Sequence, residues 1–288
     1  MQARQPKVNN SSRVRVWQSS ALDNTIFLHA DHPNHKFDRH FHDGYAIGVI
    51  DSGCQAFLYE NARRMDMPEG SVALISPGIP HWGGPGSQRG WQYRMLYPST
   101  ALVGRALEDI FEDGRARNFN SPVVYDAALK NMLADLHSAC AVPEVDDIEV
   151  ESRFLVVVRH AFAKHAGVKA HNNSNDPRAA NKMRELIEDE FDRNVSLLRL
   201  ANTVGMSRFQ ALRSFKVAFG LPPHAYLRQL RVRNAHALIS MRLPLSKVAI
   251  EVGFFDQAHM NRAFRRTVGY TPGVLLKAAG AISSKTLP

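Results

Sequence analysis

Two copies of one short pattern stand in the last third of this chain: Leu197-Leu-Arg-Leu-Ala-Asn-Thr-Val-Gly205 followed by Ser207, and Ser246-Lys-Val-Ala-Ile-Glu-Val-Gly253 followed by Asp256. In each copy a helical segment ends at a glycine, the residue that most readily adopts the left-handed backbone found after a helix. Ser and Asp are good N-caps, so each predicts the start of a second helix. Helix, glycine turn and capped helix together predict a helix-turn-helix, the motif that presents one helix to the major groove of DNA.

Positive charge is concentrated around these two copies. From residue 193 to the C-terminus there are 15 Lys and Arg, against two acidic residues, Glu251 and Asp256. Residues 1–170, by contrast, hold 18 basic and 19 acidic residues. A solvated surface normally mixes the two signs, so the imbalance favours binding of a polyanion such as DNA over a merely solvating role.

The second helix of each copy is predicted to bury one face. At 3.6 residues per turn, the helix capped by Ser207 buries Ala211, Phe215 and Phe219, and the helix capped by Asp256 buries Met260, Phe264 and Val268. The opposite faces carry side chains that suit base edges and phosphates. These outward residues are Phe209, Arg213 and Lys216 in the first copy, and Gln257, Asn261, Arg262 and Arg265 in the second, with Arg266 expected on phosphate.

A long helix is predicted between the copies, from Pro223 to Met241. Its 19 residues span about 28 Å at 1.5 Å per residue. This is comparable to one DNA turn of roughly 34 Å, so one chain is expected to place both second helices in successive major grooves. Arg228, Arg231 and Arg233 are expected to point mostly outward.

Further residues in and around the two copies form a pattern with specific spacing. They are Ala201, Gly205, Met206, Ser207, Phe215, Gly220, Pro223, Tyr226 and Arg231, then Val248-Ala249, Gly253-Phe254, Asp256-Gln257, Arg262, Phe264, Gly269 and Tyr270-Thr-Pro-Gly273. Because of this pattern, the segment 178–277 resembles the AraC/XylS family of bacterial transcription regulators. The resemblance implies a regulator, expected to be an activator, that binds double-stranded promoter DNA and contacts RNA polymerase.

The resemblance also adds two residues to the predicted DNA-binding set. Family members contact bases from positions matching Phe209, Leu212 and Arg213, and from positions matching Gln257, Ala258 and Arg262. This chain departs from the family at Ala211-Leu212, where a large apolar residue is usually followed by a polar one, so Leu212 is an alternative core residue. The start of each second helix, namely Ser207, Arg208 and Asp256, is included as well. The full predicted set is Ser207, Arg208, Phe209, Leu212, Arg213, Lys216, Asp256, Gln257, Ala258, Asn261, Arg262, Arg265 and Arg266.

The first part of the chain predicts an antiparallel β-barrel or sandwich. Short β-rich runs alternate with turns at Asp51-Ser-Gly53 and in the 83–90 loop. Helical periodicity then appears in two apolar stripes, which cover either the barrel of the same chain or the same helices of a second subunit. The β-rich runs are Thr25–His29, Phe37–His42, Ala46–Ile50, Gln55–Tyr59, Ser71–Ile75 and Trp91–Tyr97, and the helices are Ser99–Gly114, Ser121–Ala141 and Asp147–His165.

The expected fold is therefore a two-domain one: an antiparallel β-barrel with following helices, then an all-α domain with two helix-turn-helix motifs joined by a linker helix. A polar, turn-rich segment separates the two. The predicted parts are a tail at 1–13, the barrel at 14–98, a helical segment for packing or dimerisation at 99–166, a linker at 167–177, the DNA-binding domain at 178–278 and a tail at 279–288.

Three histidines stand out in the barrel. His40-Phe-His42 is predicted on one strand, where a spacing of two places both imidazoles on one face, and His81 follows later. This order, with Gly70 and Pro77 between, resembles the cupin motifs, and the AraC family commonly joins a cupin-like effector domain to its DNA-binding half. The acidic ligand of the cupin pattern is absent, so no cofactor is expected and the histidines are interpreted as wall residues, with a divalent metal site as the alternative.

An effector pocket is expected in the same barrel. Trp91, Tyr93, Met95 and Tyr97 alternate onto one strand face and Arg94 onto the other; either face is a candidate lining, and an ordinary barrel core is the alternative to a pocket. The ligand is an unidentified small molecule. The predicted effector-binding residues are His40, His42, Tyr45, His81, Trp91, Tyr93 and Arg94.

Several other classes of protein are disfavoured. Cys54 and Cys140 are isolated thiols, which do not support a disulfide framework or a zinc ribbon and fit a cytoplasmic protein. The longest apolar candidate, Phe154–Val158, is far too short to span a membrane, and the polar start of the chain lacks the apolar region of a signal peptide. A metal-dependent cupin enzyme with a DNA-binding tail is the alternative function, and a non-specific architectural DNA protein is a third.

Overall fold

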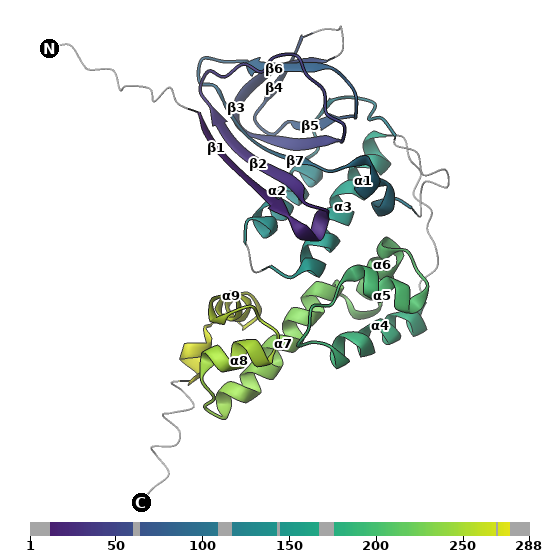
Figure 1. Cartoon of the computed structure of the whole chain (residues 1–288), viewed down its shortest axis with the longest axis vertical. Coiled ribbons are helices and arrows are strands. Elements are labelled where there is room, and N and C mark those ends of the chain that lie inside the picture. The colour runs from purple at the N-terminus through teal and green to yellow at the C-terminus, as the bar shows by residue number, and fades with distance from the viewer. Residues whose placement is uncertain are drawn as a thin grey trace, which may run out of the picture. The chain divides into compact units, whose positions relative to one another are not determined.

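The structure is a computed structural model of the 288-residue chain, and it describes residues 12–59, 64–108, 117–142, 145–166, 176–268 and 270–276. The chain divides into two compact units, shown in Figure 1. The first unit is Met1–Ala141 with Arg153–His171, and the second is Val142–Ser152 with Asn172–Pro288. The division differs from contiguous domains at one point, because residues 142–152 group with the second unit. The predicted tail at 279–288 and most of the predicted linker lie outside the described residues.

The first unit is built on an antiparallel sheet. In the part of the chain that the structure describes, its strands run in the order β1-β2-β7-β3-β5-β8, with β4 and β6 paired to β3. This arrangement confirms the predicted antiparallel fold. The strands are β1 (Arg13–Ser19), β2 (Thr25–His32), β3 (Ala46–Tyr59), β4 (Arg64–Pro68), β5 (Val72–Ile75), β6 (His81–Pro85), β7 (Trp91–Tyr97) and β8 (Val123–Val124).

Strand β3 joins the two halves of the barrel. Its first half pairs with β5 and β7, and its second half, from Cys54, pairs with β4 and β6. A register shift between Ile50 and Ser52 lies where the pairing changes, and Gly53 follows with φ 76°. A Cβ on Gly53 would lie 2.2 Å from the carbonyl oxygen of Gly90, so the close approach of β7 requires glycine here. The turn predicted at residues 51–53 is therefore wrong: the strand bends but continues.

Two other local predictions differ from the structure. Residues 37–42 are not a strand; among them only His40 forms an isolated antiparallel bridge, with His81. Part of the loop predicted at 83–90 belongs to β6. In both places the residues pair with distant partners, and a short window of sequence does not contain that information.

Helices complete the first unit. They are the 3₁₀ turn η1 (Ser20–Leu22), α1 (Thr100–Ala106), α2 (Ala127–Cys140) and the part of α3 (Asp147–His165) from Arg153 onward. The two predicted apolar stripes are buried within the single chain: Leu129, Leu133 and Leu136 on α2, and Phe154, Val158 and Phe162 on α3. These side chains are therefore unavailable for a subunit interface, and the intramolecular alternative holds for them.

The second unit is helical. Helices α4 (Pro177–Asp189), α5 (Leu197–Val204) and α6 (Arg208–Phe219) pack together, as do α8 (Leu245–Glu251) and α9 (Gln257–Val268). Helix α7 (Pro223–Ser240) contacts helices of both groups, which lie towards its two ends in Figure 1. The second group is held by an apolar core that includes Ile239, Phe254, Met260 and Phe264. The structure thus contains both predicted helix-turn-helix motifs and the helix between them.

Candidate DNA-binding and effector sites

The first helix-turn-helix is α5 and α6. Gly205 ends α5 with a left-handed φ of 66°. Ser207 then caps α6 with a reciprocal pair of bonds: its hydroxyl accepts from the Gln210 backbone N–H at 3.2 Å, and the Gln210 side-chain oxygen accepts from the Ser207 N–H at 3.0 Å. The Ser207 hydroxyl is therefore part of the framework that fixes where α6 begins.

The second motif, α8 and α9, is made in the same way. Gly253 has φ 83°, and a Cβ placed there would lie 2.7 Å from the carbonyl oxygen of Asp192, so this turn packs tightly on the α4–α5 connection. The Asp256 carboxylate accepts a 2.6 Å hydrogen bond from the backbone N–H of His259 and so caps α9. Each recognition helix thus has a defined start, which sets the rotation of its outward face.

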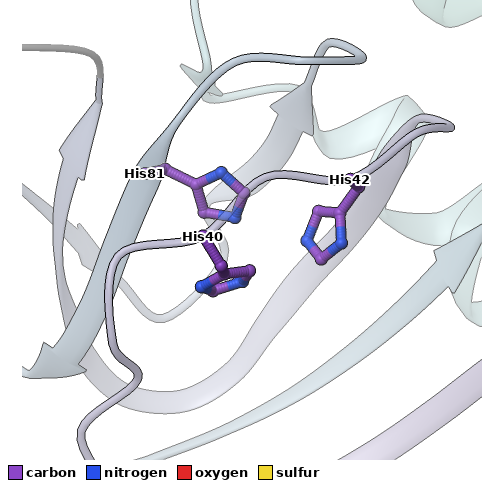
Figure 2. Close-up of side chains that lie close together, drawn as sticks. All are labelled: His40, His42 and His81. Atoms are coloured by element: carbon purple, nitrogen blue, oxygen red, sulfur yellow. The ribbon is translucent and has the colours of Figure 1, made fainter.

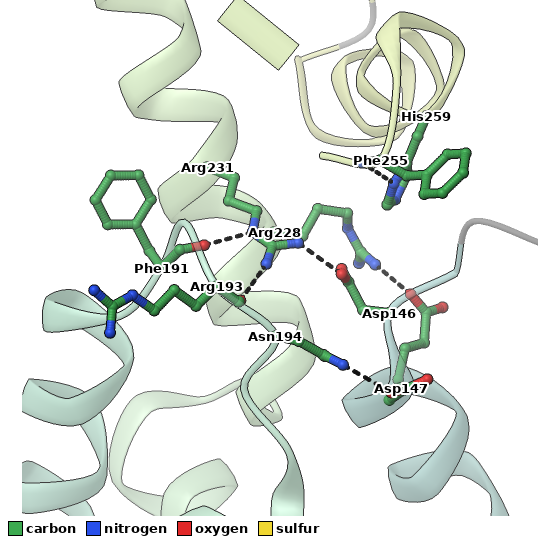
Figure 3. Close-up of polar contacts among 10 residues, drawn as sticks. Asp146, Asp147, Phe191, Arg193, Asn194, Arg228, Arg231, Phe255 and His259 are labelled. Carbon is green, nitrogen blue, oxygen red and sulfur yellow. Dashed lines mark hydrogen bonds and ion pairs between the residues drawn. The ribbon is translucent and has the colours of Figure 1, made fainter. Parts of the chain in front are cut away.

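Arg231 of α7 lies at the junction of the second unit, where its side chain is 1% exposed. Figure 3 shows its guanidinium between three acceptors: Nε donates to Phe191 O at 2.7 Å, Nη2 to Arg193 O at 2.8 Å and Nη1 to the Asp146 carboxylate at 2.6 Å. Only the planar guanidinium offers donors in this fork geometry. The expectation that Arg231 points outward is therefore wrong, because its charge joins α7 to the α4–α5 connection.

Asp146 belongs to a short acidic segment, residues 146–151, which we call the acidic turn. Four of its acids contact other parts of the second unit. Asp147 accepts from Asn194 at 2.9 Å, and Glu151 from the backbone N–H of Leu197 at 2.9 Å. Glu149 lies 3.0 Å from Arg228 and 3.6 Å from Arg266. The sequence-based predictions did not include this role, although four acidic residues within six positions were a signal for it.

In the first unit, the three predicted histidines come together. Figure 2 shows the imidazoles of His40, His42 and His81 side by side, and one nitrogen from each lies within 4.8 Å of the others. His40 itself forms the backbone bridge with His81, the first residue of β6, so the pairing of backbones brings the two side chains together. Burial lowers the pKa of His42 to about 4, and the neighbouring His81 and His40 add to this effect. His42 is thus a neutral imidazole at neutral pH.

The three histidines line a cavity of about 60 Å³ inside the barrel. Its remaining wall is largely apolar and aromatic, and includes Phe37, Phe57, Met95 and Tyr97. Burial raises the pKa of the Tyr97 phenol to about 12, so this hydroxyl stays protonated. A small apolar cavity with a few convergent polar groups is typical of a ligand site.

Comparison with known proteins decides the family. The AraC-like ligand binding domain matches residues 24–158, and a helix-turn-helix domain matches residues 200–278. The chain belongs to the AraC/XylS family. It is a DNA-binding transcription regulator with an N-terminal AraC-like ligand binding domain. The matches give no support to the alternative function, a metal-dependent enzyme.

Two relatives are similar over most of this AraC-family chain, and a third over a shorter part. The HTH-type transcriptional regulator YbfI of Bacillus subtilis is 28% identical over 226 residues, which are 78% of this chain and 82% of YbfI. The transcriptional activator NphR of a Rhodococcus species is 26% identical over 84% of this chain and 72% of NphR. MtrA of Neisseria gonorrhoeae, an HTH-type transcriptional regulator, is 35% identical over 32% of this chain and 30% of MtrA.

The recognition helices of this AraC-family chain differ in how openly they present the predicted residues. On α9 most are exposed, namely Gln257, Ala258, Arg262, Arg265 and Arg266, whereas Asp256 and Asn261 are half-buried. On α6 Lys216 is exposed, whereas Ser207, Arg208, Phe209 and Arg213 are half-buried.

One member of the predicted set, Leu212, is 5% exposed and belongs to the core together with Ala211. The prediction that Leu212 contacts DNA is therefore wrong, and the alternative core role holds because its side chain is buried. Val268, expected to be buried on α9, is 38% exposed.

The predicted effector residues also separate into two groups. Tyr93 lines the cavity with the histidines, and Trp91 is stacked on Tyr93 within the same core cluster. The prediction for Tyr45 and Arg94 is wrong, because neither side chain lines the cavity. The Tyr45 hydroxyl donates to Arg117 O at 2.9 Å and its ring packs on Phe162, away from the cavity. Arg94 lies on the opposite strand face, where it pairs with Asp51.

Among the described residues, no helix is both long enough and apolar enough to cross a membrane.

Proposed function

We propose that this protein is a ligand-responsive activator of transcription that binds promoter DNA with α6 and α9 in successive major grooves. One observation carries the proposal: two separately capped recognition helices, with polar and basic outward side chains, belong to one compact unit and are joined by α7. Two differentiated recognition helices suit recognition of base edges, which a non-specific architectural protein does not need.

The proposal includes the partners. The cavity of the first unit binds a small molecule, and the DNA-bound protein contacts RNA polymerase in the cytoplasm, as the family resemblance implies. The first unit acts as a sensor and not as a catalyst. A homodimer is proposed as well, through surfaces other than the apolar stripes of α2 and α3, since those are buried within one chain.

Selection of bound sequences from a random DNA pool by the full-length chain tests DNA recognition. We expect one consensus with two conserved segments whose centres lie roughly 10 base pairs apart, because successive major grooves on one face are separated by one helical turn. The double variant Arg213→Ala, Arg262→Ala should still bind DNA through phosphates but lose the consensus. Binding by the unchanged protein with steep salt dependence and no sequence preference would overturn the proposal.

A reporter gene placed behind the selected sequence tests the direction of regulation. Activation that depends on the selected site and disappears in the double variant supports the activator assignment. Repression from the same site would contradict that assignment while leaving DNA recognition intact.

A further inference from the structure

Two of the three imidazoles in the cluster of His40, His42 and His81 are oriented by hydrogen bonds in the way that metal-binding histidines are. His40 Nδ1 lies 2.7 Å from Asp38 O, and His81 Nδ1 lies 2.9 Å from Ile79 O. A carbonyl oxygen can only accept, so in both rings Nδ1 carries the proton. In the neutral ring Nε2 then has a free lone pair. Metal-binding histidines are fixed in this way, with the second ring nitrogen donating to a backbone carbonyl or a carboxylate.

The third ring is less constrained. Among the described residues no hydrogen bond holds either nitrogen of His42, while its ring lies 5.0 Å from the rings of both His40 and His81. Zinc–nitrogen bonds of about 2.0–2.1 Å place two nitrogens on one ion at most about 4.2 Å apart. The separation of up to 4.8 Å in the cluster therefore has to shorten. Rotation of the His42 side chain is the movement that the structure leaves available.

The surroundings leave room for further ligands of an ion. The cavity of about 60 Å³ adjoins all three rings. A cavity needs roughly 10–15 Å³ of water-accessible volume to hold one water molecule, so a few waters or a small anion fit there. A metal ion with three protein ligands and an open position toward a cavity is accessible to further ligands, whereas a structural site is closed by four protein ligands.

The donor atoms select the class of ion. Imidazole nitrogens suit zinc, iron, nickel and copper, whereas magnesium and calcium require oxygen ligands. We propose that His40, His42 and His81 bind one divalent transition-metal ion, of which Zn²⁺ is the probe of choice, with its open coordination positions facing the barrel cavity. In the proposed sensor unit, an effector that enters the cavity would contact this ion.

Metal content of the full-length protein tests the site without reference to DNA. The chain is stripped with a chelator, dialysed against Zn²⁺ and analysed for metal per chain; Co²⁺ loading is followed by its visible absorption. We expect one ion per chain and a Co²⁺ spectrum of nitrogen ligation. His42→Gln should weaken binding by ~10-fold or more, because one of three protein ligands is lost while the bridge between His40 and His81 stays intact.

His29→Gln is the matched control, since this histidine lies on β2 of the same barrel with its side chain 49% exposed and outside the cluster. It should bind Zn²⁺ like the unchanged protein. Tryptophan fluorescence of each variant checks that the barrel remains folded, because Trp17, Trp82 and Trp91 all lie in the first unit. Equal Zn²⁺ affinity in His42→Gln and His29→Gln, or no stoichiometric Zn²⁺ in the unchanged protein, would overturn the proposal. Sequence selection by the second unit is independent of either result.

Discussion

Arg262 is the residue on which base recognition by the second motif is most directly tested. It is exposed on α9, beyond the Asp256 cap that fixes the start of the helix. A bidentate Arg–guanine contact contributes about 1–3 kcal/mol of discrimination. We predict that Arg262→Ala weakens binding to the selected sequence by this amount and relaxes the preference at one position, measured by competition against sequences changed at single positions.

Lys182→Ala removes one positive charge from an exposed position on α4, outside both recognition helices, and is the control. It should change affinity for all sequences alike. If Arg262→Ala also weakens every sequence equally, the residue contacts phosphate and not a base.

His137 makes the stability of the first unit depend on pH. Its imidazole is 2% exposed, and neither ring nitrogen has a hydrogen-bond partner among the described residues. Burial, with smaller contributions from Arg94 and His29, lowers its pKa from 6.5 to about 3. The neutral form is favoured in the folded state, so stability is full above the unfolded pKa and is lost as the pH falls from 6.5 towards 3.

We predict a loss of up to about 1.4 kcal/mol per pH unit from this histidine below its unfolded pKa. His137→Leu should reduce the slope, since leucine fills a similar space without a group to protonate. Urea unfolding followed by tryptophan fluorescence at several pH values measures it, and Trp17 packs directly on His137. An unchanged slope in His137→Leu would assign the acid sensitivity to other groups.

At the scale of elements, the two helix-turn-helix turns offer a matched comparison. Gly205 and Gly253 both have left-handed backbone, but a Cβ on Gly205 meets no atom within 4 Å whereas one on Gly253 meets the backbone of Asp192. Gly205→Ala should cost about 1–2 kcal/mol of unfolding free energy from the backbone alone. Gly253→Ala should cost at least about 1 kcal/mol more, because the α4–α5 connection must move.

Chemical denaturation followed by far-UV circular dichroism compares the two variants, with the unchanged chain as reference. Equal losses of stability would show that the backbone at Asp192 moves away from the added Cβ without a measurable loss of unfolding free energy. Both glycines stand at the same place in the motif, so the sequence pattern does not distinguish them. Only the packing around them differs.

At the scale of the whole molecule, Asp146 and Arg231 test whether the acidic turn is integral to the second unit. Removing one partner of a buried ion pair leaves an uncompensated charge and typically costs 3–5 kcal/mol; two carbonyl acceptors remain here, so we predict about 3 kcal/mol for Asp146→Ala. The loss should appear in the far-UV circular dichroism transition of the helical second unit. The tryptophan transition should stay in place, because all three tryptophans lie in the first unit.

Arg231→Lys separates charge from geometry. Lysine keeps the charge but cannot serve Phe191, Arg193 and Asp146 with the fork of a guanidinium, so it should destabilise the second unit as well. Full stability of Arg231→Lys would mean that charge alone matters at this junction, and a shift of the tryptophan transition instead would place the contribution of Asp146 in the first unit.

The sequence by itself determined the helices α5 to α9 of the second unit, the capped starts of α6 and α9 and most of the buried faces of these two helices. Helical periodicity, N-caps and C-terminal glycines act over a few residues, so they are visible in a short window. The same reasoning located the strands β2, β5 and β7 to within a few residues, and it selected the three histidines that line the cavity.

Only the tertiary structure decided which residues meet across the chain. It placed Tyr45 and Arg94 away from the cavity, Leu212 in the core and Arg231 beneath the surface, and it brought residues 146–151 into the second unit. It also joined the two halves of β3 through a bulge and brought His40 to His81 by a single backbone bridge. The physical reason is that burial and strand pairing depend on partners tens of residues away, which local propensity does not encode.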